Sequence, residues 1–161
     1  VLLQADIKVN NDTIRIYTTH LQSNLFNKKD YERLQKIKSG EDSIVSNSKN
    51  ILSKIKRGIT SRAIQADRVK EVLSNSPYPT LVCADLNDVP NSYTYFKVRG
   101  NMQDAFLKKG FGIGRSFSAI SPTLRIDFIF ADKKFRVKQF NRVVKNLSDH
   151  YMLVADVELK K

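Results

Sequence analysis

Four short segments of the sequence place polar or ionisable side chains at the end of, or inside, an otherwise apolar run. A carboxylate beside a buried strand costs desolvation free energy unless a cation, a metal ion or a hydrogen-bond donor compensates its charge. Residues of this kind are therefore candidates for chemistry. The segments are residues 19–23 (Thr-His-Leu-Gln-Ser), 85–87 (Asp-Leu-Asn), 125–129 (Arg-Ile-Asp-Phe-Ile) and 148–150 (Ser-Asp-His).

Asp85 and Asn87 are separated by one residue and follow the apolar run at residues 80–84. If the backbone stays extended, both side chains point the same way and offer a carboxylate and an amide to one small target. The pair is also typical of an Asx turn that ends a strand, and alone it favours that structural interpretation. Asp127 differs, because it lies within an apolar run that should be buried and so needs a partner.

The two histidines of the chain, His20 and His150, both lie at strand ends within these segments. One such histidine usually has a structural role, but two together favour a shared site. Asp149 and His150 are adjacent, so on a strand their side chains point to opposite sides. One of them can then bind a metal ion while the other faces a phosphate or a second carboxylate. A paired aspartate fixes the imidazole tautomer and stabilises its charged form.

In this order, the motifs Thr-His-Leu, Asp-Leu-Asn-Asp, Ile-Asp-Phe-Ile-Phe and Ser-Asp-His resemble the endonuclease/exonuclease/phosphatase superfamily, which includes deoxyribonuclease-I-like nucleases. Each motif is weak alone, and the set spans about residues 1 to 158. The resemblance implies an α+β fold, a four-layer α/β/β/α sandwich. This chain would supply half of it, as one mixed β-sheet with helices on its outer face.

The resemblance also implies an activity, the metal-dependent hydrolysis of a phosphodiester or phosphomonoester by an activated water. Asp85 would orient or deprotonate the water, and Asn87 would hydrogen-bond the scissile phosphate. Asp127 would pair with His150. His150 and His20 would contact the phosphoryl oxygens as they gain charge in the transition state.

For the cofactor, the resemblance implies Mg²⁺ or Mn²⁺, with Asp149 and Asp85 as metal ligands. The motif residues offer oxygen donors and no cysteine cluster, which suits a hard cation. The substrate stays open, because the family acts on nucleic acids, inositol phosphates and phospholipid head groups.

The N-terminal half of the family pattern, with its early Asn and metal-binding Glu, has no match in this sequence. We therefore expect residues 1–161 to be the C-terminal portion of a single domain, with a helical insertion at residues 24–58 and the N-terminal half absent. We further expect this fragment to be inactive alone, and to associate with itself or with that half. None of the four glutamates of this chain matches the metal-binding Glu of the family, because they fall on helical, loop or terminal segments: Glu32, Glu41, Glu71 and Glu158.

Local patterns predict the elements that would position these residues. An Asn-Asn-Asp turn at residues 10–12 joins two alternating runs and predicts a β-hairpin. A long helix is expected to begin near Ser48, to kink or divide at Gly58, and to carry Arg62 on a solvated basic face. Cys83 is expected to be a small buried residue in a central strand. Beyond the hairpin, the expected elements are a short helix at residues 28–38 and strands at 80–84, 124–131 and 151–159.

The composition favours polyanionic partners, because the net charge is +12. Residues 133–145 hold six basic residues and no acidic one, which suits a solvated surface and a binding face equally well. A polyanion- or nucleic-acid-binding module that keeps the scaffold without turnover is therefore the alternative function. No apolar run approaches the ~20 residues needed to span a bilayer, and the sequence predicts no compartment.

Overall fold

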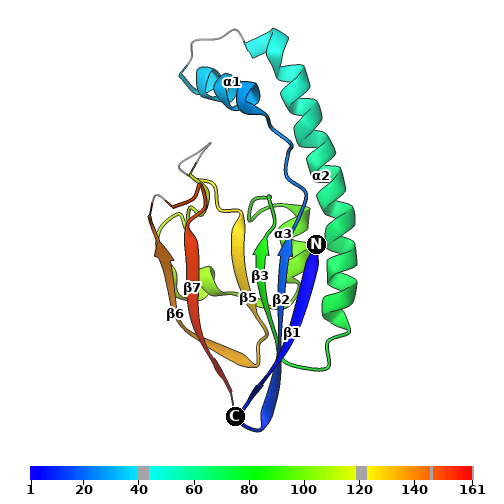
Figure 1. The fold of residues 1–161 in the computed structure, drawn as a ribbon, viewed down its shortest axis with the longest axis vertical. Helices are drawn as coiled ribbons and strands as arrows, with labels where there is room; N and C mark the ends of the chain where they lie inside the picture. Colours follow the sequence, from blue (N-terminus) through cyan, green and yellow to red (C-terminus); the bar gives the residue numbers. More distant parts are fainter. Residues whose placement is uncertain (40–43, 119–122, 146, 161) are drawn as a thin grey trace.

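A five-stranded mixed sheet lies at the centre of the computed structural model, which describes residues 1–39, 44–118, 123–145 and 147–160 (Figure 1). The spatial order of its strands is β1-β2-β3-β5-β4. β2 runs antiparallel to β1 and parallel to β3, and β5 runs antiparallel to β3. The mixed sheet and the N-terminal hairpin are as the sequence predicted. The strands are β1 (Leu2–Val9), β2 (Asp12–His20), β3 (Thr80–Asp85), β4 (Gln103–Asp104) and β5 (Asp127–Ala131).

Helices cover one face of this sheet. Ala66 and Val69 of α2 (Ile44–Ser74) and Tyr95 of α3 (Tyr93–Arg99) pack against Tyr17 and Val82 of the central strands in one buried cluster. Burying these side chains stabilises the fold by about 1.5–3 kcal/mol for each large apolar residue. A short helix, α4 (Ala105–Lys109), follows β4. The helices thus cover the outer face of the sheet, as expected.

The helical segment after β2 differs from its prediction. α2 is one continuous helix, so neither a division at Gly58 nor a start near Ser48 is correct. Its first half extends beyond the edge of the sheet, and α1 (Lys28–Ser39) lies beside this extension (Figure 1). An ion pair between Lys54 and Asp30 links the two helices. The sequence Ser-Gly-Glu-Asp at residues 39–42 also predicts a break between the two helices, and residues 40–42 lie outside the described residues.

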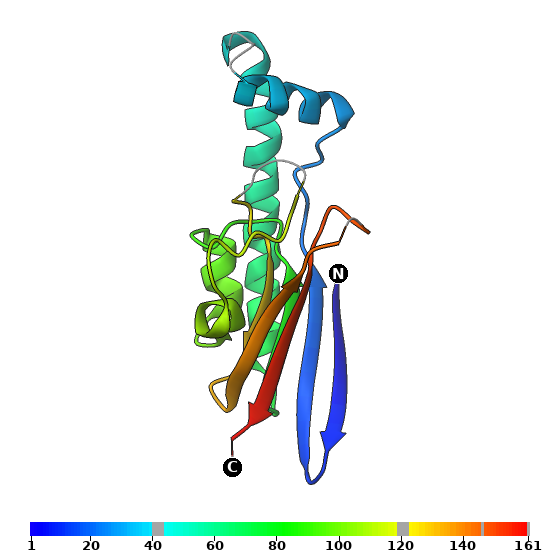
Figure 2. The same cartoon turned by 90° about the vertical axis from the view of Figure 1, so that its left-hand side faces the viewer.

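A second sheet, of two strands, was not predicted. β6 (Phe135–Val143) pairs with β7 (Met152–Leu159), and the basic segment at residues 133–145 therefore forms a strand. Phe135 and Val137 of β6 are buried and alternate with exposed basic residues. Together with β7 they pack on Ile14, Leu81 and Ile129 of the inner face, the face opposite the helices. The two-stranded sheet lies over this face and diverges from β1 and β2 (Figure 2).

One side of β3 is therefore less buried than expected. Val82 and Ala84 are buried against the helices, whereas Cys83 on the inner face is exposed, so its predicted burial is wrong. The two-stranded sheet covers only one end of that face. Among the described residues, no helix has the length and apolar character of a membrane span.

Candidate active site

The register of the sheet brings three ionisable residues to one edge. His20 lies opposite Asp85 where β2 pairs with β3, and Asp85 lies opposite Asp127 where β3 pairs with β5. Residues opposite one another on adjacent strands are close neighbours. Strand pairing alone therefore gathers two carboxylates and an imidazole at the ends of β2 and β3.

His150 reaches the same edge from the segment that precedes β7. Its Nδ1 lies 2.9 Å from Oδ2 of Asp127, within hydrogen-bond distance. The backbone N–H and the hydroxyl of Ser118 donate to the carbonyl oxygen of Asp149 at 2.8 and 2.9 Å, which fixes the residue before the histidine. The ring of Phe117 lies 4.9 Å from the imidazole, centroid to centroid. His150 is thus oriented by a carboxylate, a backbone pairing and an aromatic contact.

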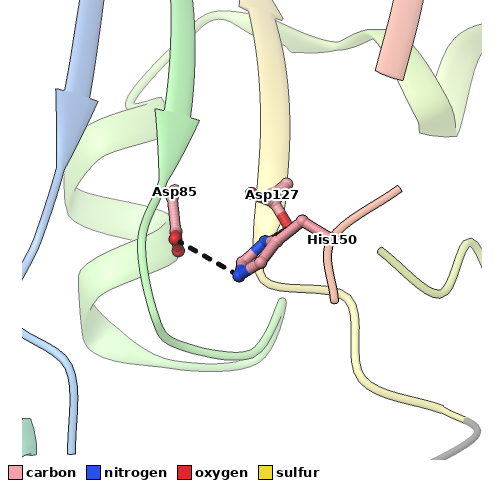
Figure 3. A group of neighbouring side chains, drawn as sticks. All are labelled: Asp85, Asp127 and His150. Carbon is pink, nitrogen blue, oxygen red and sulfur yellow. Dashed lines mark hydrogen bonds and ion pairs between the residues drawn. The ribbon is translucent and has the colours of Figure 1, made fainter. Parts of the chain in front are cut away.

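Asp85, Asp127 and His150 form one compact cluster (Figure 3). One candidate ligand atom from each lies within 4.8 Å of the others, and the described residues hold no other such group of three. Nε2 of His150 lies 4.0 Å from Oδ2 of Asp85. The three side chains come from β3, from β5 and from the segment before β7, and they point toward one another.

The charges in the cluster favour the protonated form of His150. Burial disfavours the charged imidazole, but the hydrogen bond to Asp127 and the charges of Asp127, Asp85 and Asp149 outweigh it, so the pKa of His150 is raised. Burial and the charge of Asp127 raise the pKa of Asp85, although the backbone N–H of Asn87 and the histidines oppose this shift. Two carboxylates are therefore held closer together than their mutual repulsion favours.

Asn87 forms the Asx turn that the motif predicted, and its side-chain amide also lies within the site. Its N–H donates to Oδ1 of Asp85 at 2.8 Å, which is the Asx turn, and its φ of 49° lies in the left-handed region. Its side-chain amide lies 3.1 Å from Nε2 of His20 and donates to the carbonyl oxygen of Leu21 at 3.1 Å. The turn therefore holds the amide beside His20, whose Nε2 is 3.5 Å from Oδ2 of Asp85.

Asp149 is the predicted site residue that lies outside the group formed by His20, Asp85, Asn87, Asp127 and His150. Its side chain is exposed and accepts a hydrogen bond from the hydroxyl of Ser148 at 3.3 Å. Arg125, which neighbours Asp127 in sequence, is buried and pairs with Asp104 at 2.8 Å. The structure thus groups five of the six predicted site residues at one edge and leaves the exposed carboxylate of Asp149 outside this group.

Arg62 is the residue that sequence reasoning missed. It was expected on a solvated helix face, yet it is 2% exposed. Its Nε donates to Asp88 at 3.1 Å, and its Nη1 donates to the carbonyl oxygen of Gln22 at 3.1 Å and to Oδ1 of Asn24 at 2.9 Å. Arg62 therefore links the loop after His20 to the loop after β3. The available signal was Asp88, a second acidic residue in the same motif that also needed a partner.

A model of the Endonuclease/Exonuclease/phosphatase family matches residues 54–150, more than half of the chain and three of the four motifs. The chain belongs to this family. No curated protein sequence matches it.

Solved structures with the same fold agree with this assignment to the endonuclease/exonuclease/phosphatase family. A functionally unknown conserved protein from Enterococcus faecalis V583 is 17% identical with a TM-score of 0.70, and 99% of this chain covers 56% of it. A family protein from Bacteroides vulgatus is 20% identical (TM-score 0.62; coverage 99% and 55%). The human Nocturnin catalytic domain, solved with bound sulfate, is 14% identical (TM-score 0.60; coverage 99% and 53%). This chain spans about half the length of each.

Proposed function

We propose that this chain supplies most of the catalytic side chains of a phosphoesterase, and that residues 1–161 are the C-terminal portion of one longer catalytic domain. The observation that carries the proposal is the hydrogen bond between His150 and Asp127 beside Asp85. A charged imidazole held next to a carboxylate that can orient water suits hydrolysis of a phosphate ester, in which positioning and charge stabilisation do most of the work.

Each side chain of the cluster has a role in this proposal. Asp85 accepts a hydrogen bond from the attacking water and can take its proton. The raised pKa of Asp85 makes it a better base near neutral pH than an ordinary aspartate. His150, kept charged by Asp127, donates to a phosphoryl oxygen as that oxygen gains negative charge. Asn87 and His20 line the same edge and bind the other phosphoryl oxygens.

The residues present fit a hard divalent cation. Asp85 and Asp127 concentrate negative charge in a half-buried cluster, where burial and the charge of Asp127 raise the pKa of Asp85. We expect Asp85 and Asp149 to bind Mg²⁺ or Mn²⁺. When bound, such a cation would polarise the phosphoryl group and stabilise its developing charge.

The alternative is a polyanion-binding module without turnover, which the net charge of +12 favours. The two functions differ in one measurement on the full-length protein, hydrolysis of bis(4-nitrophenyl) phosphate. We expect activity that EDTA abolishes and that Mg²⁺ or Mn²⁺ restores. Turnover that is undiminished in chelator would contradict the metal assignment. Binding of polyanions with no turnover of any phosphate ester would favour the alternative.

His150→Ala provides the matching test of the site. Losing a transition-state contact of this kind lowers kcat by about 10²-fold or more. Asp156→Ala is the control, because this carboxylate is exposed on β7, away from the cluster. Equal activity of the two variants would remove the cluster from the mechanism.

A further inference from the structure

An apolar groove opens beside the catalytic cluster, between the helices of the 24–58 segment and the loops at the edge of the sheet. Its volume is about 660 Å³, enough for part of a small-molecule ligand. Residues of α1 and α2 form one wall, and the loops that follow β3 and precede β5 form the other. The proposed hydrolysis uses none of the aliphatic side chains on the helical wall.

The walls of the groove are mainly apolar. Leu34, Ile55 and Ile59 line the helical side, and Leu124 and Ile126 line the loop side. Ile59 is 48% exposed, so water now covers apolar surface that a ligand could bury. Burying a methylene group stabilises a complex by about 0.8 kcal/mol. Polar side chains also line the groove, but most already have partners: Arg62 donates to Asp88 and Asn24, and Asn87 donates to the carbonyl oxygen of Leu21.

The aromatic side chains of the groove do not form a stacking platform. Phe26 and Tyr31 contact each other edge to face, with centroids 5.9 Å apart. The ring of Phe117 already contacts the imidazole of His150. These rings therefore do not form one flat surface, which favours a flexible chain over a flat base.

The groove adjoins the catalytic cluster, although none of the three cluster side chains lines it. Asn87 lines it, and so does Phe117, which contacts His150. An ester whose phosphate lies between Asn87 and His150 must direct one substituent past these two residues. The path along the helical wall leads that substituent into the groove.

Basic residues lie on the other side of the loop after β2. A second cavity shares Leu25 with the groove and is lined by Lys54, Lys56 and Arg57 of α2. Lys56 and Arg57 are exposed. The arm formed by α1 and α2 thus combines an apolar groove with positive charge, which matches a molecule that is both anionic and apolar.

We propose that the groove binds the aliphatic chain of an amphiphilic phosphate ester whose phosphate lies at Asp85, Asp127 and His150. This inference rests on the proposed phosphoesterase function and specifies its substrate class. The 24–58 segment then has a role: it supplies the helical wall that selects a chain over a short or polar substituent.

The test compares methyl and octyl 4-nitrophenyl phosphate as substrates of the full-length protein. Both esters release the same 4-nitrophenolate, so the difference in kcat/KM reports the chain alone. We expect the octyl ester to react at least about 10-fold faster in kcat/KM, given the transfer energy of methylene groups. Ile59→Ser should reduce this preference severalfold and leave the methyl ester unchanged.

Ile64→Ser is the matched control, because Ile64 lies on the same helix, is 53% exposed and does not line the groove. It should keep the full preference. Equal kcat/KM for the two esters, or equal losses in the two variants, would overturn the inference and leave the phosphoesterase function standing. A preference for a thymidine ester that depends on Ile59 would instead indicate a base-binding groove.

If neither ester is hydrolysed, the phosphoesterase proposal fails, and calorimetric titration with decyl phosphate tests the groove separately. Weaker binding to Ile59→Ser than to Ile64→Ser would support a chain-binding groove. Identical binding to both variants would overturn it.

Discussion

At the scale of single residues, two opposing effects act on the pKa of His150. Burial lowers its pKa, and the hydrogen bond and charge of Asp127, with the charges of Asp85 and Asp149, raise it further than burial lowers it. Its net pKa lies above the ordinary value of 6.5. The charged form therefore stabilises the fold below pH 6.5, and this contribution is lost as the pH rises through the raised pKa.

The first prediction concerns this pairing. Asp127→Asn removes the charge and the best acceptor for the imidazole, so the pKa of His150 should fall and kcat should drop by about 10²-fold. Proton NMR of the imidazole resonances measures the pKa directly. Because the chain has two histidines, His20→Gln assigns the signals. An unchanged pKa in Asp127→Asn would show that other charges, not Asp127, hold His150 protonated.

The second prediction concerns Asp85, whose pKa is raised by burial and by the charge of Asp127. A raised pKa means that the folded chain holds this proton more tightly than the unfolded chain. The resulting stability is present below the ordinary value of 3.8 and is lost as the pH rises through the raised pKa. At neutral pH without metal, the ionised carboxylate therefore opposes folding.

Asp85→Asn should raise the Tm of the metal-free chain at pH 7 by about 2–4 °C and abolish hydrolysis in the full-length protein. The asparagine oxygen can still accept from the N–H of Asn87, so the Asx turn persists. Calorimetry at pH 7 and pH 4 checks the effect, which should shrink at the lower pH. A lower Tm for Asp85→Asn at pH 7 would show that the carboxylate stabilises the site.

At the scale of elements, local sequence patterns predicted those features that depend only on residues close together in the chain. The Asn-Asn-Asp turn identified the hairpin, and the motif residues were expected together because each ends or interrupts an apolar run. β6 was missed because its exposed basic residues were interpreted as a surface, although Phe135 and Val137 alternate with them. The exposure of Cys83 could not be predicted, because it depends on how far β6 and β7 reach over the inner face.

Arg62 shows a different limit of the sequence. Its burial depends on the loops that α2 meets in the fold, and helical periodicity contains no information about them. Arg62 and Asp88 have side chains that are 3% and 11% exposed, so their ion pair is largely desolvated. Removing one partner of such a pair costs about 3–5 kcal/mol, because the other charge stays buried.

The third prediction is that Arg62→Gln destabilises the chain by about 3 kcal/mol and lowers kcat by about 10-fold or more. A merely structural residue would change stability alone. A positioning residue should also shift the imidazole NMR signal of His20, because Arg62 holds the loop that follows it. Arg68→Gln, exposed on the same helix, is the control for both measurements. An unperturbed His20 signal in Arg62→Gln would limit Arg62 to stability.

At the scale of the whole molecule, the inner face of the sheet is covered at one end only. The two-stranded sheet packs over Ile14, Leu81 and Ile129, so this chain itself covers part of the face. Leu3, Ile7 and Val9 of β1 point to the same face and are 60%, 42% and 46% exposed. Because this chain spans about half of the solved structures it resembles, we propose that the rest of the domain packs here.

The last prediction follows from that exposed strip of β1. An apolar strip on a sheet that already packs face to face with another sheet favours association, so the isolated chain should form dimers or larger species at tens of micromolar. Leu3→Ser should weaken this association, because it places a hydroxyl in the strip. Leu107→Ser, which changes an equally exposed leucine (61%) on α4, should not. Light scattering after size exclusion measures both. A monomeric wild-type chain with cooperative thermal unfolding would show that the two-stranded sheet is sufficient cover and that β1 is an ordinary solvated edge.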